Sequence, residues 1–188
     1  MKLQPGSTAP SFSVEDISGN LIGLEQYQGK KLLLSFYRYA SCPFCNLRIH
    51  TLGQQAERFR RQGLEMVAVF QSSAEQVKKY AGKEETPFII IADEQRDLYQ
   101  LYGVETSWWG FTKAFIIRLP DLVRTCLQGN MPGRMDNELN RMPADFLINE
   151  KGHIEIAYFG NDIGDHLPLH DLKQYLSGHK DINVTYNT

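Results

Sequence analysis

The chain has 188 residues, of which 42% are hydrophobic and 22% charged, and its formal net charge is −2. This size and composition fit one soluble globular domain over residues 1–188, and the near-neutral charge argues against a nucleic-acid partner. No window approaches the roughly 20 apolar residues of a membrane span. The first residues also lack the apolar run of a signal peptide.

The first half of the chain alternates between strand and helix patterns. An apolar run at 32–37 is typical of a central strand that is covered on both faces. From residue 45 to about 62, apolar side chains recur at spacings of four and three, which predicts one continuous amphipathic helix. The other predicted elements are short strands within 1–30, strands at 64–70 and 87–92, and helices at 74–82 and 93–102. This order predicts parallel strand pairing with right-handed crossovers.

The second half begins with a break in this rhythm. Residues 104–141 contain an apolar, aromatic stretch and a loop with Gly and Pro, and we expect one or two helices plus a loop inserted into the α/β core. Strand patterns return at 144–149 and 153–159, which predicts an antiparallel hairpin. A last helix is predicted at 169–176, followed by a loose tail.

The stretch Cys42-Pro43-Phe44-Cys45 lies where the central strand leads into the amphipathic helix. The N-terminus of a helix carries partial positive charge, which favours a thiolate over a thiol. Two thiols separated by two residues at this point are placed for disulfide exchange. The helical pattern puts Cys45 on the buried face and Cys42 at an exposed mouth, so the two sulfurs should differ in reactivity.

Disulfide exchange accounts for the cysteine pair better than a metal site or a disulfide scaffold does. A structural zinc site usually needs four ligands, and beyond the pair the chain has only Cys126 and five histidines. Three unevenly spaced cysteines are also too few for a secreted disulfide scaffold. We therefore expect redox chemistry rather than a metal site or two inert core cysteines, with no metal or organic cofactor and a cytoplasmic location.

Two further patterns carry a family resemblance. The N-terminal pattern Gly6-x-x-Ala9-Pro10-x-Phe12 is followed by Phe36-Tyr37-Arg38, which runs into the Cys-Pro-aromatic-Cys motif. Together they resemble the peroxiredoxin family, also called alkyl hydroperoxide reductase/thiol-specific antioxidant, within the thioredoxin superfamily. The resemblance covers residues 6–176 apart from the insertion at 104–141. It implies a thioredoxin-like α/β fold with a mixed central sheet flanked by helices, a peroxiredoxin-type N-terminal extension and a helical insertion.

The family's peroxide-reducing motif, Pro-x-x-x-Thr-x-x-Cys, is altered in this chain. Laid on the sequence, the motif puts Cys45 at the peroxidatic position, Cys42 in place of the Thr and Arg38 in place of the Pro. The family's second arginine falls on Pro143. The Met142-Pro143 pair stands instead where thioredoxins keep a cis-proline beside the dithiol, and we expect Pro143 to shape the substrate groove. The resemblance thus supports dithiol chemistry more firmly than peroxide reduction.

Two chemical schemes stay open. In one, an exposed Cys42 thiolate attacks a disulfide or a sulfenic acid, and Cys45 resolves the mixed disulfide. In the other, the Cys45 thiolate attacks a peroxide and Cys42 condenses with the resulting sulfenic acid. Either scheme ends in a Cys42–Cys45 bridge that a thioredoxin- or glutathione-type thiol reductant would reduce. Arg38 either stabilises a thiolate or is a surface charge at the strand end.

Several other residues that could take part in chemistry are expected to have structural roles only. Arg48 is expected to be a solvated surface charge, and His50 to point away from the cysteines. Cys126 is expected to pack in an apolar helix rather than resolve a mixed disulfide. The acidic and histidine side chains before the last helix look like a metal cluster, and we assign them to turns and caps. They are Asp162, Asp165, His166 and His170.

The aromatic residues Trp108, Trp109 and Phe111 have three possible roles: an apolar substrate pocket, a subunit interface such as that of a homodimer, or the insertion's own small core. The interpretation that the sequence favours is a thiol-dependent antioxidant oxidoreductase that reduces peroxides or protein disulfides. The alternative is a non-enzymatic interaction module that keeps the fold and binds a partner through this aromatic insertion.

Overall fold

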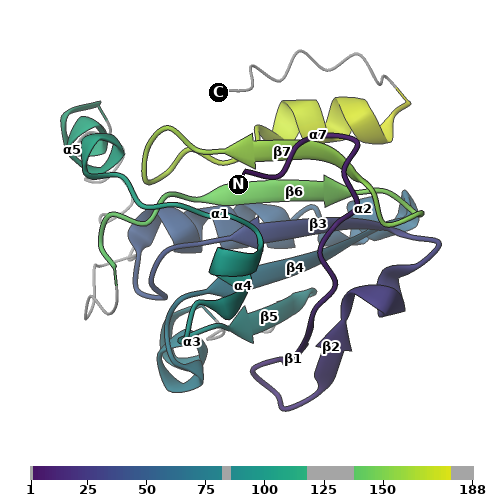
Figure 1. Cartoon of the computed structure of the whole chain (residues 1–188), viewed down its shortest axis with the longest axis horizontal. Helices are drawn as coiled ribbons and strands as arrows, with labels where there is room; N and C mark the ends of the chain where they lie inside the picture. Colours follow the sequence, from purple (N-terminus) through teal and green to yellow (C-terminus); the bar gives the residue numbers. More distant parts are fainter. Residues whose placement is uncertain (1, 82–85, 118–137, 179–188) are drawn as a thin grey trace.

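The computed structural model describes residues 2–81, 86–117 and 138–178 (Figure 1). Its strands are β1 (Ser13–Glu15), β2 (Leu21–Gly23), β3 (Lys31–Phe36), β4 (Leu64–Phe70), β5 (Ile89–Ala92), β6 (Ala144–Ile148) and β7 (Ile154–Phe159). Its helices are the 3-10 helix η1 (Leu24–Tyr27) and the α-helices α1 (Pro43–Gly53), α2 (Ala56–Arg61), α3 (Ala74–Tyr80), α4 (Asp97–Leu101), α5 (Trp108–Ile117) and α7 (Leu169–Leu176).

The main sheet has five strands in the order β5-β4-β3-β6-β7. β3 pairs in parallel with β4, and β4 in parallel with β5, which confirms the pairing predicted from the alternating strands and helices. β6 pairs antiparallel with both β3 and β7, so the predicted hairpin is also confirmed. A separate antiparallel pair, β1 with β2, precedes this sheet. The result is the mixed, helix-flanked sheet of a thioredoxin-like α/β fold.

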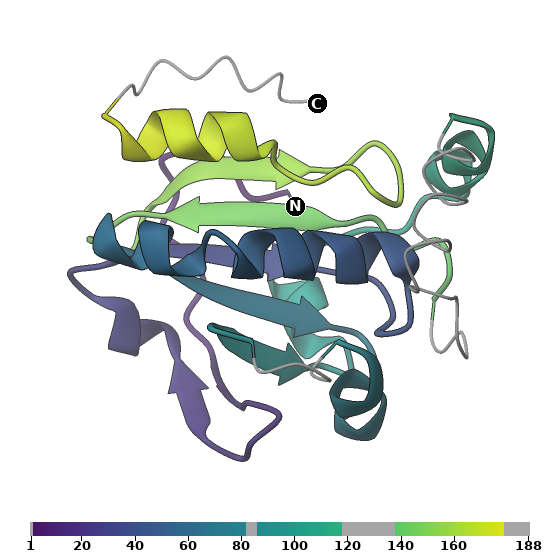
Figure 2. The same ribbon diagram turned by 180° about the vertical axis from the view of Figure 1, so that it is seen from behind.

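The central strand β3 separates two apolar layers, because its side chains alternate between the faces of the sheet. Leu32, Leu34 and Phe36 lie in the layer that includes α4. Leu33 lies in the layer built with α1, α2 and α7. Figures 1 and 2 show these helices on opposite faces, with α4 in front in Figure 1 and α1, α2 and α7 in front in Figure 2. The chain therefore leaves the buried strand β3 at Phe36 and reaches the cysteine motif within a short loop.

The single helix predicted from residue 45 to 62 is wrong, because the chain forms two helices with a break between them. The amide of Gln55 donates to Leu52 O at 3.0 Å, an i→i+3 bond that tightens the turn and ends α1. The predicted apolar stripe is nevertheless buried in both helices, from Ile49 through Ala56 to Phe59. The period of the sequence identified the buried face but not the break.

The helix predicted at 93–102 begins later, at Asp97. The carboxylate of Asp93 accepts hydrogen bonds from the amides of Asp97 and Leu98 at 3.0 and 2.9 Å, and from Tyr99 at 3.3 Å. Arg96 adopts a left-handed conformation, with φ of 65°, so the regular helix starts only after it. Asp93 therefore caps α4 from outside the helix.

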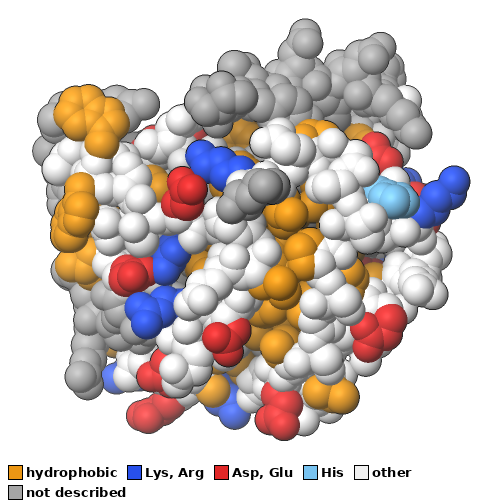
Figure 3. Space-filling model, viewed as in Figure 1, with side chains coloured by type: hydrophobic (Ala, Val, Ile, Leu, Met, Phe, Trp, Pro, Cys, Tyr) orange, Lys and Arg blue, Asp and Glu red, His pale blue; other side chains and the backbone are white. Residues whose placement is uncertain are grey.

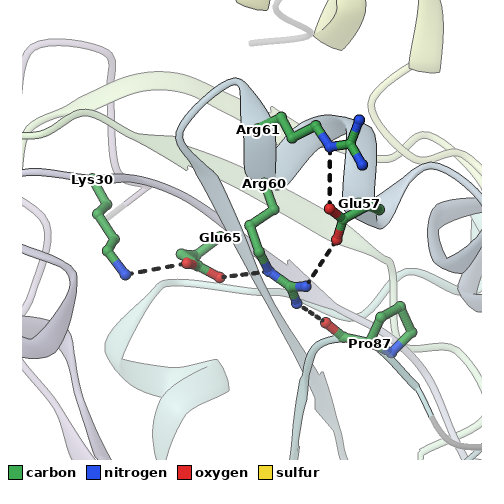
Figure 4. Close-up of polar contacts among 6 residues, drawn as sticks. All are labelled: Lys30, Glu57, Arg60, Arg61, Glu65 and Pro87. Carbon is green, nitrogen blue, oxygen red and sulfur yellow. Dashed lines mark hydrogen bonds and ion pairs between the residues drawn. The ribbon is translucent and has the colours of Figure 1, made fainter.

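A network of ion pairs attaches α2 to neighbouring strands (Figure 4). Arg60 lies between the carboxylates of Glu57 and Glu65, at 3.3 and 3.9 Å, and donates to Pro87 O at 2.6 Å. Lys30 completes the network through Glu65, at 3.2 Å. Such partly exposed pairs each contribute roughly 0–1 kcal/mol. They orient α2 against β4 and the segment before β5 more than they stabilise the fold.

Part of the sequence interpretation falls outside the described residues. The helix α5 lies within the predicted insertion at 104–141, but residues 118–137, with Cys126, and the tail from 179 are not described. The single-domain assignment for 1–188 stays a prediction. In the described ranges, no helix has the length and hydrophobicity that crossing a membrane requires.

The cap on α4 can be tested by replacing Asp93 with alanine. The change leaves three backbone amides without their acceptor, and the free energy of unfolding should fall by about 1–2 kcal/mol. Chemical denaturation of Asp93→Ala and of the control Glu94→Ala, whose side chain is exposed, checks this. Equal stability of the two variants would contradict the assignment of Asp93 as the cap.

Candidate active site

Cys42 is the N-cap residue of α1, and Cys45 lies one turn into the helix. Cys42 has extended backbone angles, with φ of −69° and ψ of 119°, and Pro43 follows at the first helical position. Proline suits this position because it has no N–H, which would lack an acceptor within the helix there, and because its φ is already helical. The carbonyl of Cys42 accepts from Asn46 N at 3.0 Å. The sequence thus starts the helix at the first cysteine, as the strand-to-helix pattern predicts.

Both cysteines are free thiols and both are buried, with exposed fractions of 0% for Cys42 and 1% for Cys45. The predicted exposed position of Cys42 is therefore wrong, whereas the predicted burial of Cys45 is confirmed. The two cysteines belong to an apolar cluster against which Phe44 and Leu139 also pack. Leu139 belongs to the segment that leads into β6. The helical period cannot reveal this segment, because it lies far from the motif in the chain.

Arg38 is 1% exposed, so the interpretation of this residue as a surface charge is wrong. Its Nη1 lies 3.5 Å from Cys42 Sγ, and its Nη2 donates to Leu139 O. The guanidinium carbon lies 4.9 Å from the ring centre of Tyr39 and 5.6 Å from that of Phe111. These contacts hold a buried cation against the first cysteine, which is the geometry that thiolate stabilisation requires.

The environments of the two sulfurs drive their pKa values apart. Burial alone raises the pKa of Cys42, but the Cys45 thiol, the Arg38 guanidinium and the amides of Cys45 and Phe44 outweigh it and bring this pKa to about 6. Burial raises the pKa of Cys45 well above its usual range, and the adjacent Cys42 raises it further. The pair therefore consists of one thiolate near neutral pH and one protonated thiol that donates to it.

Pro143 is buried, and its carbonyl accepts from Gly160 N at 2.9 Å. The peptide bonds of the described residues are all trans, so the cis bond expected at Met142-Pro143 is wrong. The neighbouring Met142 is buried in a small cluster with Ile163, against which Phe44 of the motif packs, and the role of Pro143 in a substrate groove stays a prediction. Pro143 packs closely against Gly160, where a β-carbon would lie 2.9 Å from Pro143 Cγ.

A buried pair of an aspartate and a histidine, which was not predicted from the sequence, lies on the α1 side of the sheet. His166 Nδ1 lies 3.1 Å from Asp145 Oδ2, and Asp145 is fully buried. Burial alone raises the pKa of Asp145, but His166 and then Arg48 hold it at about 2. The signal in the sequence was an acid in the middle of the apolar strand β6, opposite Ser35 of β3.

Arg48 is not the solvated surface charge that the sequence suggested. It is half-buried, and its Nη2 donates to Leu167 O at 2.6 Å, next to the Asp145–His166 pair. His50 is exposed and its ring lies 3.0 Å from the Gln54 amide, which agrees with a side chain that points away from the cysteines.

The residues before α7 divide into two groups. Asp162 accepts from Gly164 N at 2.9 Å, and Asp165 accepts from Asn161 N at 2.8 Å, so their predicted use in turns is confirmed. His166 instead pairs with Asp145. Among the residues that the structure describes, no three His, Cys, Asp or Glu side chains form a group that could hold a metal ion.

The two tryptophans of α5 point outward, with exposed fractions of 66% for Trp108 and 79% for Trp109. They therefore do not fill a core of their own, which removes one of the three possible roles. Figure 3 shows hydrophobic side chains on the outer surface at the edge where α5 lies. Phe111 differs from them, because it turns inward onto Arg38.

Comparison with known proteins identifies the family of this chain. The family model described as AhpC/TSA family matches residues 5–157. The chain belongs to the AhpC/TSA family. Peroxiredoxin Q, chloroplastic, of Sedum lineare is 29% identical over 109 residues, which are 58% of this chain and 59% of that protein. Peroxiredoxin Bcp of Escherichia coli (strain K12) is 28% identical over 123 residues, which are 64% of this chain and 79% of that protein.

The crystal structure of Peroxidoxin BcpB from Mycobacterium tuberculosis has the same fold as this AhpC/TSA member. The match covers 96% of this chain and 99% of that chain, with a TM-score of 0.66 and 15% sequence identity. The predicted family and thioredoxin-like fold are therefore confirmed. This family member is a thiol-dependent antioxidant oxidoreductase, and the non-enzymatic alternative is not favoured.

The lowered pKa of Cys42 can be measured through its alkylation by iodoacetamide, because only the thiolate reacts. The rate at Cys42, located by mass spectrometry, should rise with pH and reach half its maximum near pH 6. In Arg38→Gln this midpoint should move up by about one pH unit, because the thiolate loses a neighbouring charge. The exposed control Arg58→Gln should leave it in place. A midpoint shared by all three proteins would contradict the assigned effect of Arg38.

The Asp145–His166 pair predicts a loss of stability in acid. Because the pKa of Asp145 is lower in the folded chain than its ordinary value of 3.8, its stabilising effect is complete above about pH 4 and is lost as the pH falls through about 2. Asp145→Asn should lower the free energy of unfolding by about 3 kcal/mol at neutral pH and should lack this acid-dependent part. Denaturation curves of both proteins, with the exposed Glu75→Gln as control, test this. A variant as stable as the parent would overturn it.

Proposed function

We propose that this chain is a thiol peroxidase in which the Cys42 thiolate attacks the peroxide and Cys45 resolves the product. One observation carries the proposal: the Arg38 guanidinium lies 3.5 Å from Cys42 Sγ, while the neighbouring Cys45 thiol donates to the same sulfur. The nucleophile, its cation and its resolving partner are thus already side by side in the reduced chain.

In the first step, the Cys42 thiolate attacks one peroxide oxygen. A sulfur–oxygen bond forms, the oxygen–oxygen bond breaks, and the sulfur is oxidised to sulfenic acid while the peroxide is reduced. The leaving oxygen takes the electron pair and acquires a proton to become water or an alcohol. Arg38 supports this step, because its Nε is buried and, within the described residues, has no hydrogen-bond acceptor. This donor is available for the oxygen on which negative charge develops.

In the second step, Cys45 attacks the oxidised sulfur of Cys42. The Cys42–Cys45 disulfide forms, the sulfur–oxygen bond breaks, and the proton of the Cys45 thiol leaves with the hydroxyl as water. Only two residues separate the cysteines in the chain, and the Cys45 thiol already donates to Cys42. No large rearrangement is therefore required for the bridge to form.

The family motif assigns the two cysteines in the opposite order, with Cys45 as the peroxidatic residue. The different environments of the sulfurs support the order proposed here. Burial and the neighbouring Cys42 raise the pKa of Cys45, whereas the pKa of Cys42 is about 6. At neutral pH the attacking thiolate therefore belongs to Cys42.

Peroxide is the proposed oxidant, and a thiol supplies the electrons that return the bridge to two thiols. We extend the proposal to a thioredoxin- or glutathione-type reductant, with exchange on protein disulfides as the second activity of the same bridge. A reducing compartment such as the cytoplasm suits a cycle that starts from a free dithiol. The exposed pair Trp108 and Trp109 is the proposed contact surface if the chain forms a homodimer.

The order of the two cysteines is tested with serine variants. Cys42→Ser should abolish steady peroxide consumption with a thioredoxin donor and should form no sulfenic acid at Cys45. Cys45→Ser should also stop turnover, but one equivalent of peroxide should leave a sulfenic acid on Cys42 that a dimedone probe traps. The control Cys126→Ser should keep the parent rate.

The outcomes of these variants separate the schemes. A sulfenic acid at Cys45 in Cys42→Ser would reverse the proposed order and restore that of the family motif. Disulfide reduction by the parent protein without peroxide turnover would replace the peroxidase proposal with a disulfide-exchange function.

A further inference from the structure

A small apolar cluster lies beside the thiol pair. Met142 and Ile163 are its buried members, with exposed fractions of 7% and 5%, and Phe44 and Phe111 pack against them. We call these four residues the apolar cap. They come from the segment before β6, the loop before α7, the first turn of α1, and α5. Four separate parts of the chain therefore meet beside the reactive sulfur.

Two members of the apolar cap reach the catalytic groups directly. Phe44 stands in the sequence between the two cysteines and packs against their cluster. Phe111 places its ring centre 5.6 Å from the guanidinium carbon of Arg38. The cap therefore covers the cation and the first turn of the helix together.

The packing of α5 onto the apolar cap is close. A β-carbon at Gly110 would lie 2.6 Å from Met142 Sδ and 2.9 Å from Asn161 O, both shorter than van der Waals contact. Glycine at this position lets the helix backbone approach Met142. Such a packed group has little room for an inserted side chain or ligand.

Within the described residues, the exposed fractions of the catalytic groups show that a peroxide has no open path from solvent to Cys42 Sγ. Cys42, Cys45 and Arg38 are 0%, 1% and 1% exposed. A peroxide must nevertheless bring an oxygen into contact with Cys42 Sγ. Hydrogen peroxide has only two heavy atoms and carries no carbon substituent, so it needs only a small fluctuation of the surrounding side chains. An alkyl hydroperoxide must displace the aromatic rings or leave its carbon substituent without space.

We propose that the apolar cap makes this enzyme selective for hydrogen peroxide over bulky alkyl hydroperoxides, with Phe111 as the residue that determines the selectivity. The proposal rests on the peroxidase function proposed above. The outward direction of Trp108 and Trp109, which are 66% and 79% exposed, supports it, because neither ring lines a path to the sulfur. Phe111 is the aromatic residue of α5 that faces the site, and its ring obstructs the approach of a large substrate to Cys42.

The selectivity is tested by comparing kcat/KM for hydrogen peroxide and for cumene hydroperoxide. The parent protein should prefer hydrogen peroxide by about tenfold or more, and Phe111→Ala should reduce this preference by about tenfold because the ring no longer obstructs the larger substrate. The matched control Trp109→Ala changes an exposed ring of the same helix and should keep the parent preference. Equal use of both peroxides by the parent, or an unchanged preference in Phe111→Ala, would overturn the proposal.

A second measurement tests the cap without peroxide turnover. Mass spectrometry can follow the alkylation of Cys42 in the parent protein by iodoacetamide and by a fluorescein maleimide. The parent should strongly favour the small reagent, and Phe111→Ala and the milder Phe111→Leu should narrow the ratio. A size-independent rate at Cys42 in the parent would overturn the cap. If no peroxide is consumed while the size dependence holds, the peroxidase function fails and the cap stands.

Discussion

The contact between Arg38 and Cys42 organises the whole site. A guanidinium that is only 1% exposed is expensive to remove from water, by several kcal/mol, unless a negative charge and hydrogen-bond acceptors surround it. The Cys42 thiolate supplies the charge, Leu139 O accepts one donor, and the rings of Tyr39 and Phe111 cover the faces of the cation. The Cys45 thiol and then the Arg38 guanidinium lower the pKa of Cys42, so the buried cation and the buried thiolate stabilise each other.

This interaction also explains how the chain tolerates its departures from the family motif. The threonine, the proline and the second arginine of the motif are replaced by Cys42, Arg38 and Pro143. The positive charge near the sulfur is nevertheless present, because Arg38 supplies it from the loop after β3. The helix N-terminus adds two backbone amides. Groups that lower the pKa of a thiol are thus present on other residues, and the second thiol, which we propose as the resolving group, lies in the same helix turn.

Local patterns in the sequence determined most of the fold. The apolar run of β3, the spacing from Ile49 to Phe59 and the alternation of strands and helices follow from periods that a window of a few residues contains. The break after Gly53 and the late start of α4 did not follow, because each depends on single hydrogen bonds. At α4 the decisive group is the carboxylate of Asp93, four residues before the helix begins.

The site was less predictable, because long-range contacts define it. The motif itself identified Cys42 and Cys45, and the burial of Cys45 followed from its helical position. The burial of Cys42 and the fixed position of Arg38 depend on Leu139, which is 101 residues from Arg38. The Asp145–His166 pair joins two residues 21 apart, and the acid within the apolar strand β6 indicated a buried charge without identifying His166 as its partner.

The position of the tryptophans has a consequence for observing this enzyme. The chain contains two tryptophans, and both stand at the start of α5, where the ring of Trp108 meets that of Phe111 edge to face at 5.9 Å. All of the protein's indole emission therefore originates from the helix whose inner face touches Arg38. The spectrum and its quenching by iodide report on the surroundings of this helix alone, so the native chain carries its own optical probe of the cover over its reactive sulfur.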